Sequence, residues 1–171
     1  MSFSVRAMTV QDINDLVMLA ARFVEAPHWS RRDYEKILLP DLPRAAPPGG
    51  LTRCAFITLC DSTLAGFAVA SWLPQEAAAE VEGLVVDEKY RRQGMASALL
   101  RACMEWAANA GASNMRLEVR ASNTAALALY QRHGFSALGR RYAYYSAPVE
   151  DAVLLQAPLD SAKLSEGRHP L

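Results

Sequence analysis

Apolar and polar positions along the chain repeat with two periods, one typical of strands and one typical of amphipathic helices. Two helices are expected in the first half, each preceded by a capping pair: Thr9 with Asp12, and Ser30 with Asp33. These helices extend to about residues 23 and 39, and Pro27 ends the first of them. Strands are predicted over 4–8, 53–60 and 64–73, with a turn at 61–63 and a proline-rich loop over Pro40–Gly50.

The second half of the chain alternates strands and helices more clearly. Strands are predicted over 79–86, 115–119, 135–145 and 152–159, and helices over 95–109 and 123–133, with Gly111 and Gly134 just after the helices. The buried face of the helix over 95–109 is expected to carry Ala98, Leu99, Ala102, Cys103, Trp106 and Ala107. Because no repeat or linker interrupts this order, residues 1–160 are predicted to form one α/β domain, and 161–171 a mobile polar tail.

Composition excludes several classes of protein. The 171 residues include 18 basic and 18 acidic side chains, so no surface for nucleic acid or for an acidic membrane is indicated. The N-terminus lacks an apolar signal segment, and no apolar run is long enough to cross a bilayer, which predicts a cytoplasmic protein. Cys54, Cys60 and Cys103 are expected to be free thiols, and neither they nor the three histidines have the spacing of a metal site.

The stretch 85–96 is the most informative in the chain. An apolar strand ends there, and basic and small residues follow directly before a helix. Unpaired amides at a helix N-terminus favour an anion such as a pyrophosphate. Gly94 lets the backbone approach a ligand closely, while Arg91 and Arg92 add positive charge. We interpret the stretch as a binding turn for a phosphate-bearing cofactor; the alternative is a solvated helix start with a turn glycine.

Two motifs resemble a known family. The pattern Arg-x-x-Gly-x-Ala over 91–96 resembles the acetyl-coenzyme A signature of the GNAT N-acetyltransferase superfamily. The run L-E-V-R-A-S-N over 117–123, continued by A-L-A-L-Y over 126–130 and by G-F at 134–135, resembles the signature of one branch, the bacterial ribosomal-protein alanine N-acetyltransferases. Shorter similarities lie at 26–30 and 140–152, and the resemblance covers roughly residues 5–159.

The resemblance implies a fold, a reaction and a set of site residues. The fold is a mixed, mostly antiparallel sheet of six or seven strands flanked by about four helices, and the reaction is direct transfer of acetyl from acetyl-coenzyme A to an amine. The residues expected to bind the cofactor are Leu84, Val85, Val86, Arg91, Arg92, Gln93, Gly94, Met95, Ala96, Asn123 and Tyr130. Those expected to bind the acceptor are Trp29, Glu82, Tyr142 and Tyr145.

Glu118 and Tyr130 are the candidate catalytic residues. Alternation along the strand directs Glu118 to the face opposite its apolar neighbours, and the family assigns the general base to this glutamate. Glu82 is a rival base and Glu80 a weaker one, and Glu118 could instead be a strand carboxylate paired with Arg116 or Arg120. Tyr130 is the proposed general acid for the departing thiolate. Its alternative role is that of a core tyrosine.

The motifs indicate the acetyl donor more directly than the acceptor. An α-amine, with a pKa of about 7.7–8.0, loses its proton more easily than a lysine amine near ~10.4, which favours a protein N-terminus. A small-molecule amine, a lysine, and a non-catalytic module that binds acetyl-coenzyme A remain alternatives. The chain departs from the branch at Gly83, where asparagine is usual, at His28, where proline is usual, and in the loop over Pro40–Gly50. All three changes fall on the expected peptide side, and the oligomeric state is left open.

Overall fold

The computed structural model describes residues 2–23, 26, 29–38 and 50–160, which contain four α-helices and a seven-stranded mixed sheet. The elements are β1 (Phe3–Ala7), the 3-10 turn η1 (Val10–Asp12), α1 (Ile13–Ala20), α2 (Arg31–Leu38), β2 (Thr52–Cys60), β3 (Thr63–Trp72), β4 (Ala78–Val86), the 3-10 turn η2 (Glu88–Tyr90), α3 (Met95–Ala110), β5 (Asn114–Arg120), α4 (Thr124–Arg132), β6 (Ser136–Ser146) and β7 (Val149–Pro158). The predicted fold class and every predicted strand are confirmed. Pro27, His28, residues 39–49 of the expected loop and the expected tail over 161–171 lie outside the described residues.

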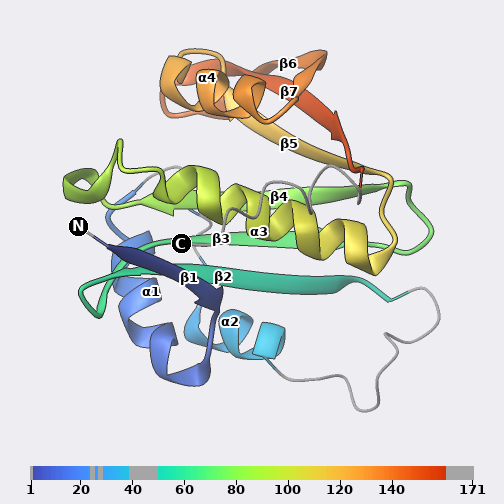
Figure 1. The fold of residues 1–171 in the computed structure, drawn as a ribbon. Helices are drawn as coiled ribbons and strands as arrows, with labels where there is room; N and C mark the ends of the chain where they lie inside the picture. Colours follow the sequence, from blue (N-terminus) through green and yellow to red (C-terminus); the bar gives the residue numbers. More distant parts are fainter. Residues whose placement is uncertain (1, 24–25, 27–28, 39–49, 161–171) are drawn as a thin grey trace.

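The strands follow the spatial order β1-β2-β3-β4-β5-β7-β6 (Figure 1). Neighbouring strands are antiparallel everywhere except between β4 and β5, which run parallel because α3 crosses over between them. The last two strands form the predicted antiparallel pair, but β7 inserts next to β5 and leaves β6 at the edge of the sheet. The sheet is therefore mostly antiparallel, as expected.

Helices cover both faces of the sheet, and the alternation of side chains along β3 explains the division. Phe67 and Val69 pack in the cluster with α1 and α2, whereas Ala68 and Ala70 pack in the cluster with α3. Figure 1 shows α1 and α2 on one side of β2 and β3, with α3 running across the other side. Small residues under α3 bring this helix close to the sheet.

The helix starts agree with the capping pairs. The carboxylate of Asp12 accepts hydrogen bonds from the backbone N–H and the hydroxyl of Thr9, both at 2.7 Å. The guanidinium of Arg6 binds the same carboxylate at 2.7 Å, and this pair lowers the pKa of Asp12 to about 2. Ser30 and Asp33 form the equivalent contacts before α2, with the Ser30 hydroxyl donating at 2.6 Å. The first helix is shorter than predicted, because its first turn is the 3-10 turn η1 and α1 ends at Ala20.

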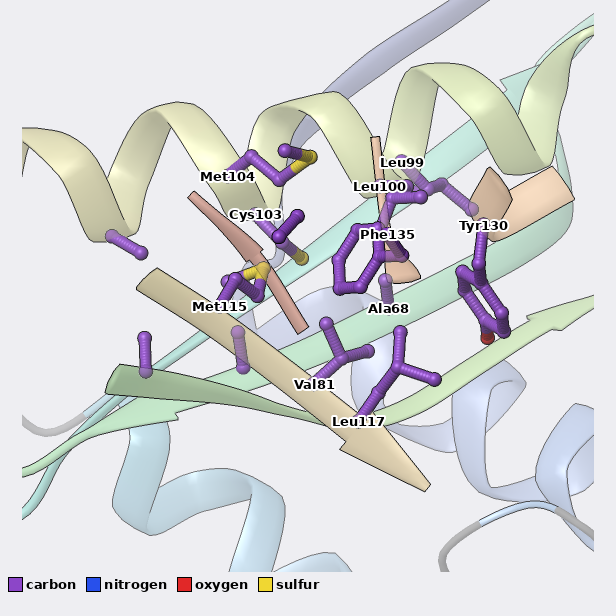
Figure 2. Close-up of a cluster of buried hydrophobic side chains, with 14 of the residues drawn as sticks. Ala68, Val81, Leu99, Leu100, Cys103, Met104, Met115, Leu117, Tyr130 and Phe135 are labelled. Carbon is purple, nitrogen blue, oxygen red and sulfur yellow. The ribbon is translucent and has the colours of Figure 1, made fainter. Parts of the chain in front are cut away.

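The expected buried face of α3 needs correction. Leu100 and Met104 are buried although they were not predicted to be, whereas Ala98, Ala102 and Trp106 are only partly buried. The helix packs against β2, β3 and β4 on one side and lies near β5 on the other. Its buried residues therefore cover a wider part of its circumference than the single predicted stripe, and the centre of this buried face is shifted from the predicted one. Figure 2 shows Leu99, Leu100 and Cys103 of α3 in the same buried cluster as Met115 and Leu117 of β5.

Three further expectations concern the thiols, metals and membranes. Cys54, Cys60 and Cys103 are free, and the last two are buried. Within residues 2–23, 26, 29–38 and 50–160, no group of three or more His, Cys, Asp or Glu side chains is placed to hold a metal ion. None of the four described α-helices has the length and apolar character needed to cross a bilayer.

Candidate active site

The sheet opens between β4 and β5. These strands pair only over Ala78–Glu80 and Asn114–Arg116, and beyond that point they diverge toward their carboxyl ends (Figure 1). The candidate residues Glu82 and Glu118 follow the last paired positions of the two strands. A parallel pair that separates leaves backbone groups of both strands without a strand partner in the opening, so an extended ligand could bind there.

The turn after β4 is held by a buried carboxylate. Burial alone would raise the pKa of Asp87, but the ion pair with Arg22 at 2.7 Å and the hydrogen bond from the Lys89 N–H at 3.2 Å lower it. The backbone N–H of Asp87 also donates to the Ala65 carbonyl of β3 at 2.8 Å. These contacts fix the start of the turn against the sheet.

The end of the turn adopts a left-handed backbone. Arg92 has a φ of 62° and Gly94 a φ of 86°, and Gly94 is the N-cap of α3. A Cβ at Gly94 would approach nothing closer than 4.0 Å, the distance to Cζ of Phe3, so the backbone conformation rather than internal crowding favours glycine here. This conformation leads directly into the free N–H groups of the first turn of α3.

The side chains expected to bind the cofactor divide into two groups. Arg91 turns back on the protein: its Nε donates to the Val86 carbonyl at 3.2 Å, and its guanidinium lies 5.6 Å from the ring centre of Phe23. Arg92 and Gln93 are exposed, and Ala96 is partly buried. The side chains of Val85, Val86 and Met95 belong to the core and that of Leu84 is partly buried, so the β4 residues could offer mainly their backbone to a ligand.

Tyr130 lies on α4, at the border between core and opening. Its side chain is only 8% exposed and packs against Phe135 with ring centres 5.7 Å apart. Figure 2 shows Tyr130 at the end of the buried cluster toward which β4 and β5 point. Burial, with smaller contributions from Tyr145 and Cys103, raises the pKa of Tyr130 to about 12. Asn123 caps this helix, because its side chain accepts from the Ala126 N–H at 3.1 Å.

Glu118 faces away from its buried neighbours Leu117 and Val119, as the alternation predicts. Its partner is neither Arg116 nor Arg120: Oε1 of Glu118 lies 3.0 Å from Nε of Arg141 on β6. The Tyr144 hydroxyl also donates to Glu118, and this hydrogen bond raises the pKa of Tyr144. Glu118 is thus held by two side chains of the edge strand.

Glu82 is held differently. The β3–β4 register passes from Val69–Gly83 to Ala70–Val81, so Glu82 is the extra residue of a β-bulge. The Arg53 guanidinium on β2 donates to both carboxylate oxygens of Glu82, at 2.9–3.1 Å. The same guanidinium lies 5.4 Å from the ring centre of Trp29. Trp29, Arg53 and Glu82 therefore form one continuous contact from the region before α2 to the opening.

Glu80, the third candidate base, lies near both other carboxylates. Desolvation, followed by the charges of Glu82 and Glu118, raises the pKa of Glu80, although this residue is exposed. Three carboxylates here face two guanidinium groups, those of Arg53 and Arg141, so the group keeps one net negative charge, which would attract an ammonium group.

The hairpin of β6 and β7 was only partly anticipated. Arg120 lies 4.1 Å from the ring centre of Tyr145 and binds Glu150 at 3.3 Å, which fixes the hairpin to β5. Tyr144 and Tyr145 pack edge to face at 5.1 Å, whereas Tyr142 is 82% exposed. Tyr145 thus lies near Tyr130 and packs on Tyr144, which is hydrogen-bonded to Glu118. No described contact links Tyr142 to Tyr130 or Glu118.

Sequence reasoning missed Arg53 and Arg141 as site residues. Arg141 belongs to the R-R-x-Y-Y-like segment over 140–145, which was a usable signal. Arg53 had none, because its contact with Glu82 depends on the register of β2, β3 and β4.

Comparisons with known proteins point to one family. The model of the acetyltransferase (GNAT) family matches residues 12–135. The [ribosomal protein bS18]-alanine N-acetyltransferase of Escherichia coli is 37% identical over 98 residues, which are 56% of this chain and 65% of the relative's own length. The putative enzyme of that name from Bacillus subtilis is 28% identical over 89% of this chain and 93% of its own length.

Solved structures show the same fold. The crystal structure of the ribosomal-protein-S18-alanine N-acetyltransferase from Escherichia coli superposes with a TM-score of 0.73 and 25% identity, over 93% of this chain and 95% of that one. The structure of the NatC complex bound to Gag peptide and CoA contains a chain with a TM-score of 0.76 and 21% identity, over 94% of this chain and all of that one.

Proposed function

This chain belongs to the acetyltransferase (GNAT) family, and we propose that it transfers an acetyl group from acetyl-coenzyme A to the N-terminal α-amine of a protein. The observation that carries the proposal is the grouping of side chains at the opening between β4 and β5. Glu118 accepts from Tyr144, Tyr144 packs on Tyr145, and Tyr145 lies close enough to Tyr130 to affect its pKa. A candidate base and a candidate acid thus belong to one neighbourhood.

The donor would bind along the turn between β4 and α3. Its pyrophosphate suits the N–H groups around Gly94, where the helix dipole adds positive potential. The pantetheine arm suits the backbone of β4 after the bulge, because this strand has no partner toward β5 there. Acetyl-coenzyme A supplies an activated acyl group as a thioester.

The acceptor would enter as an ammonium group attracted by Glu80, Glu82 and Glu118. Glu118 accepts one proton from it, directly or through a water, and passes that proton to solvent. The neutral nitrogen then attacks the thioester carbonyl carbon, so that a C–N bond forms and the C–S bond breaks. An α-amine suits such a modest base because its pKa is about 7.7–8.0.

Tyr130 would act on the leaving sulfur. Its hydroxyl donates a hydrogen bond, and then its proton, to the sulfur as the C–S bond breaks. Because the pKa of Tyr130 is about 12, the resulting tyrosinate would recover the remaining proton from the former amine nitrogen at once. The products are an N-acetylated terminus and coenzyme A in the thiol form, so atoms and protons balance.

The acceptor class is proposed from two supports. The first is the negative potential of the three glutamates, and the second is the similarity to enzymes named for alanine at the N-terminus of ribosomal protein bS18. We propose the same kind of acceptor here, a protein N-terminus with a small first residue such as alanine or serine.

A peptide panel tests the proposal. The protein is incubated with acetyl-coenzyme A and peptides that begin with Ala, Ser, Met or Gly, with either the α-amine or the lysines blocked, and mass spectrometry locates the acetyl group. We expect transfer to free N-terminal Ala or Ser and none to peptides with a blocked α-amine. Acetylation confined to lysines, or no acetylation of any peptide, would contradict the proposal.

The Glu118→Gln variant tests the base in the same assay. We expect a fall in kcat of about 10²-fold and a flatter rise of rate with pH, because the variant cannot accept the proton. An unchanged pH–rate profile would remove Glu118 from the role of base.

A further inference from the structure

The edge strand β6 departs from regular pairing in the part that contacts Glu118. Three residues of β6, 142–144, lie opposite the single residue Asp151 of β7, so β6 contains a β-bulge with two extra residues. Ala143, at the centre of this bulge, has a φ of 49°, a left-handed conformation that residues with a Cβ rarely adopt. Such a conformation persists only where neighbouring groups stabilise it.

The bulge decides which side chains reach Glu118. In a regular strand, residues three apart point to opposite faces of the sheet, so Arg141 and Tyr144 would be separated. Instead, Nε of Arg141 lies 3.0 Å from Oε1 of Glu118, and the Tyr144 hydroxyl donates to the same carboxylate. The guanidinium of Arg141 also lies 5.5 Å from the ring centre of Tyr144. The extra residues therefore bring both donors to one carboxylate.

The side chain of Asp151 stabilises the bulge. Its Oδ1 accepts from the backbone N–H of Ala143 at 3.0 Å, and its Oδ2 lies 3.5 Å from Nη1 of Arg140. The backbone of Asp151 is itself fixed, because its carbonyl accepts from the Ala121 N–H at 3.1 Å, directly after β5. Since β6 has a partner strand on one side only, a hydrogen bond from β7 to the centre of the bulge constrains the residues on both sides of that bulge.

We propose that Asp151 is a positioning residue for the candidate base: it fixes the bulge of β6, and the bulge places Arg141 and Tyr144 on the carboxylate of Glu118. The inference rests on the proposed function, in which Glu118 takes the proton of the acceptor amine. A glutamate side chain has several free torsions, and both donors together reduce the rotamers that it populates. A carboxylate held in one orientation is within reach of the amine more often, so its position affects kcat.

A spectroscopic measurement tests the positioning without relying on catalysis. The six tyrosines are labelled with ¹³C at Cζ, and the signal of Tyr144 is identified by its loss in Tyr144→Phe. The hydrogen bond to Glu118 raises the pKa of Tyr144. If Asp151→Ala releases the bulge, this hydrogen bond is lost, and we expect the Tyr144 signal to titrate at lower pH than in the wild type.

Asp12→Ala is the matched control. Asp12 also accepts from a backbone N–H and pairs with an arginine, but it does so before α1. This variant should leave the titration of Tyr144 unchanged. Asp151→Ser, whose side chain is polar but one bond shorter than that of aspartate, gives the same test if Asp151→Ala does not fold.

Two rescue variants separate the hydrogen bond to Ala143 from the ion pair with Arg140. Asp151→Asn keeps an oxygen that can accept from the Ala143 N–H, although it loses the ion pair. In the double variant Asp151→Ala with Ala143→Gly, the glycine adopts the left-handed backbone without strain. Asp151→Ala should lower kcat for peptide acetylation about tenfold, with the Kd of acetyl-coenzyme A within about twofold. Each rescue variant should restore kcat to within about threefold of the wild type and restore the titration of Tyr144.

The outcomes separate this inference from the proposed function. An unchanged titration of Tyr144 in Asp151→Ala, or a kcat that neither rescue variant restores, would overturn the inference. A shifted titration with normal kcat would overturn it as well, because catalysis would then not depend on this positioning. If the wild type acetylates no peptide, but the titration of Tyr144 shifts in Asp151→Ala and recovers in Asp151→Asn, the placing of Glu118 by Asp151 is supported while the proposed function is contradicted.

Discussion

The two sides of the candidate site are built in different ways. The donor side, residues Asp87 to Ser97, is one continuous stretch whose shape comes from backbone conformation: a buried cap, two left-handed residues and a helix start. The acceptor side consists of Glu80, Glu82 and Glu118 with their partners, which come from β2, β4, β5 and β6. Local backbone geometry thus sets one side, whereas long-range side-chain pairing sets the other.

This difference affects how easily each side changes. The ion pairs of Glu82 with Arg53 and of Glu118 with Arg141 involve arginines that are 39% and 55% exposed, and such pairs typically contribute about 0–1 kcal/mol each. Substitutions can therefore rearrange the acceptor side at little cost in stability. The donor side depends on backbone positions that most side chains disfavour. We therefore expect the donor side to tolerate few substitutions and the acceptor side to tolerate more.

Tyr130 lies where the two sides meet, and its replacement should have the largest effect. In Tyr130→Phe the ring keeps its packing on Phe135 but the sulfur loses its proton donor. We expect kcat to fall about 10²-fold or more, with the Kd of acetyl-coenzyme A changed less than about threefold. Stopped assays and calorimetry measure the two quantities, and a parallel loss of affinity would make Tyr130 a packing residue.

The pKa of Tyr130 adds a constraint on the wild type. Because burial raises it to about 12, the hydroxyl keeps its proton well into alkaline solution. The wild-type kcat should therefore show no decline due to loss of this proton between about pH 8 and 10. A decline that disappears in Tyr130→Phe would show that the tyrosine ionises earlier than this environment implies.

Gly94→Val tests the donor side alone and should have an intermediate effect. A β-branched residue at a φ of 86° costs about 1–2 kcal/mol or shifts the turn, and either outcome weakens binding at the helix start. We expect the Kd of acetyl-coenzyme A to rise about 10-fold or more, with kcat at saturating donor nearly unchanged.

Gly111→Val is the matched control, because Gly111 is left-handed at the other end of α3, with a φ of 112°. It should lower stability without changing the Kd, and thermal unfolding with calorimetry separates the two effects. Tight binding of the donor by Gly94→Val would contradict the assignment of the turn.

The same contrast explains what the sequence could predict. Caps, strand alternation and the turn at Gly94 are local, so Asp12, Asn123 and Glu118 were placed correctly from neighbours a few residues away. The buried arc of α3 was misjudged because two flanks of the sheet pack on it, and Leu100 faces a flank that a single stripe does not include.

Side-chain partners on the acceptor side were beyond local reasoning. Residues in the same strand as Glu118 were the nearest candidates in sequence, but its partner Arg141 comes from β6, with β7 lying between the two strands. The bulge at Glu82 shifts the register of β3 and β4, and no residue pattern signals where such a shift occurs. Pairing across strands requires the register, which the sequence does not display.

Arg53 and Glu82 offer the smallest and most discriminating test. If Glu82 shapes the acceptor side, Glu82→Gln and Arg53→Met should each raise the KM for the peptide about threefold to fivefold, with kcat and the Kd of acetyl-coenzyme A within about twofold. The double variant should then be no worse than either single one, because one shared contact is lost.

If Glu82 is instead the base, Glu82→Gln should lower kcat about 10²-fold while Arg53→Met leaves it intact. The contacts favour the first outcome: three hydrogen bonds from one guanidinium already engage both oxygens of Glu82, whereas Glu118 is held by an exposed arginine and a tyrosine of the edge strand.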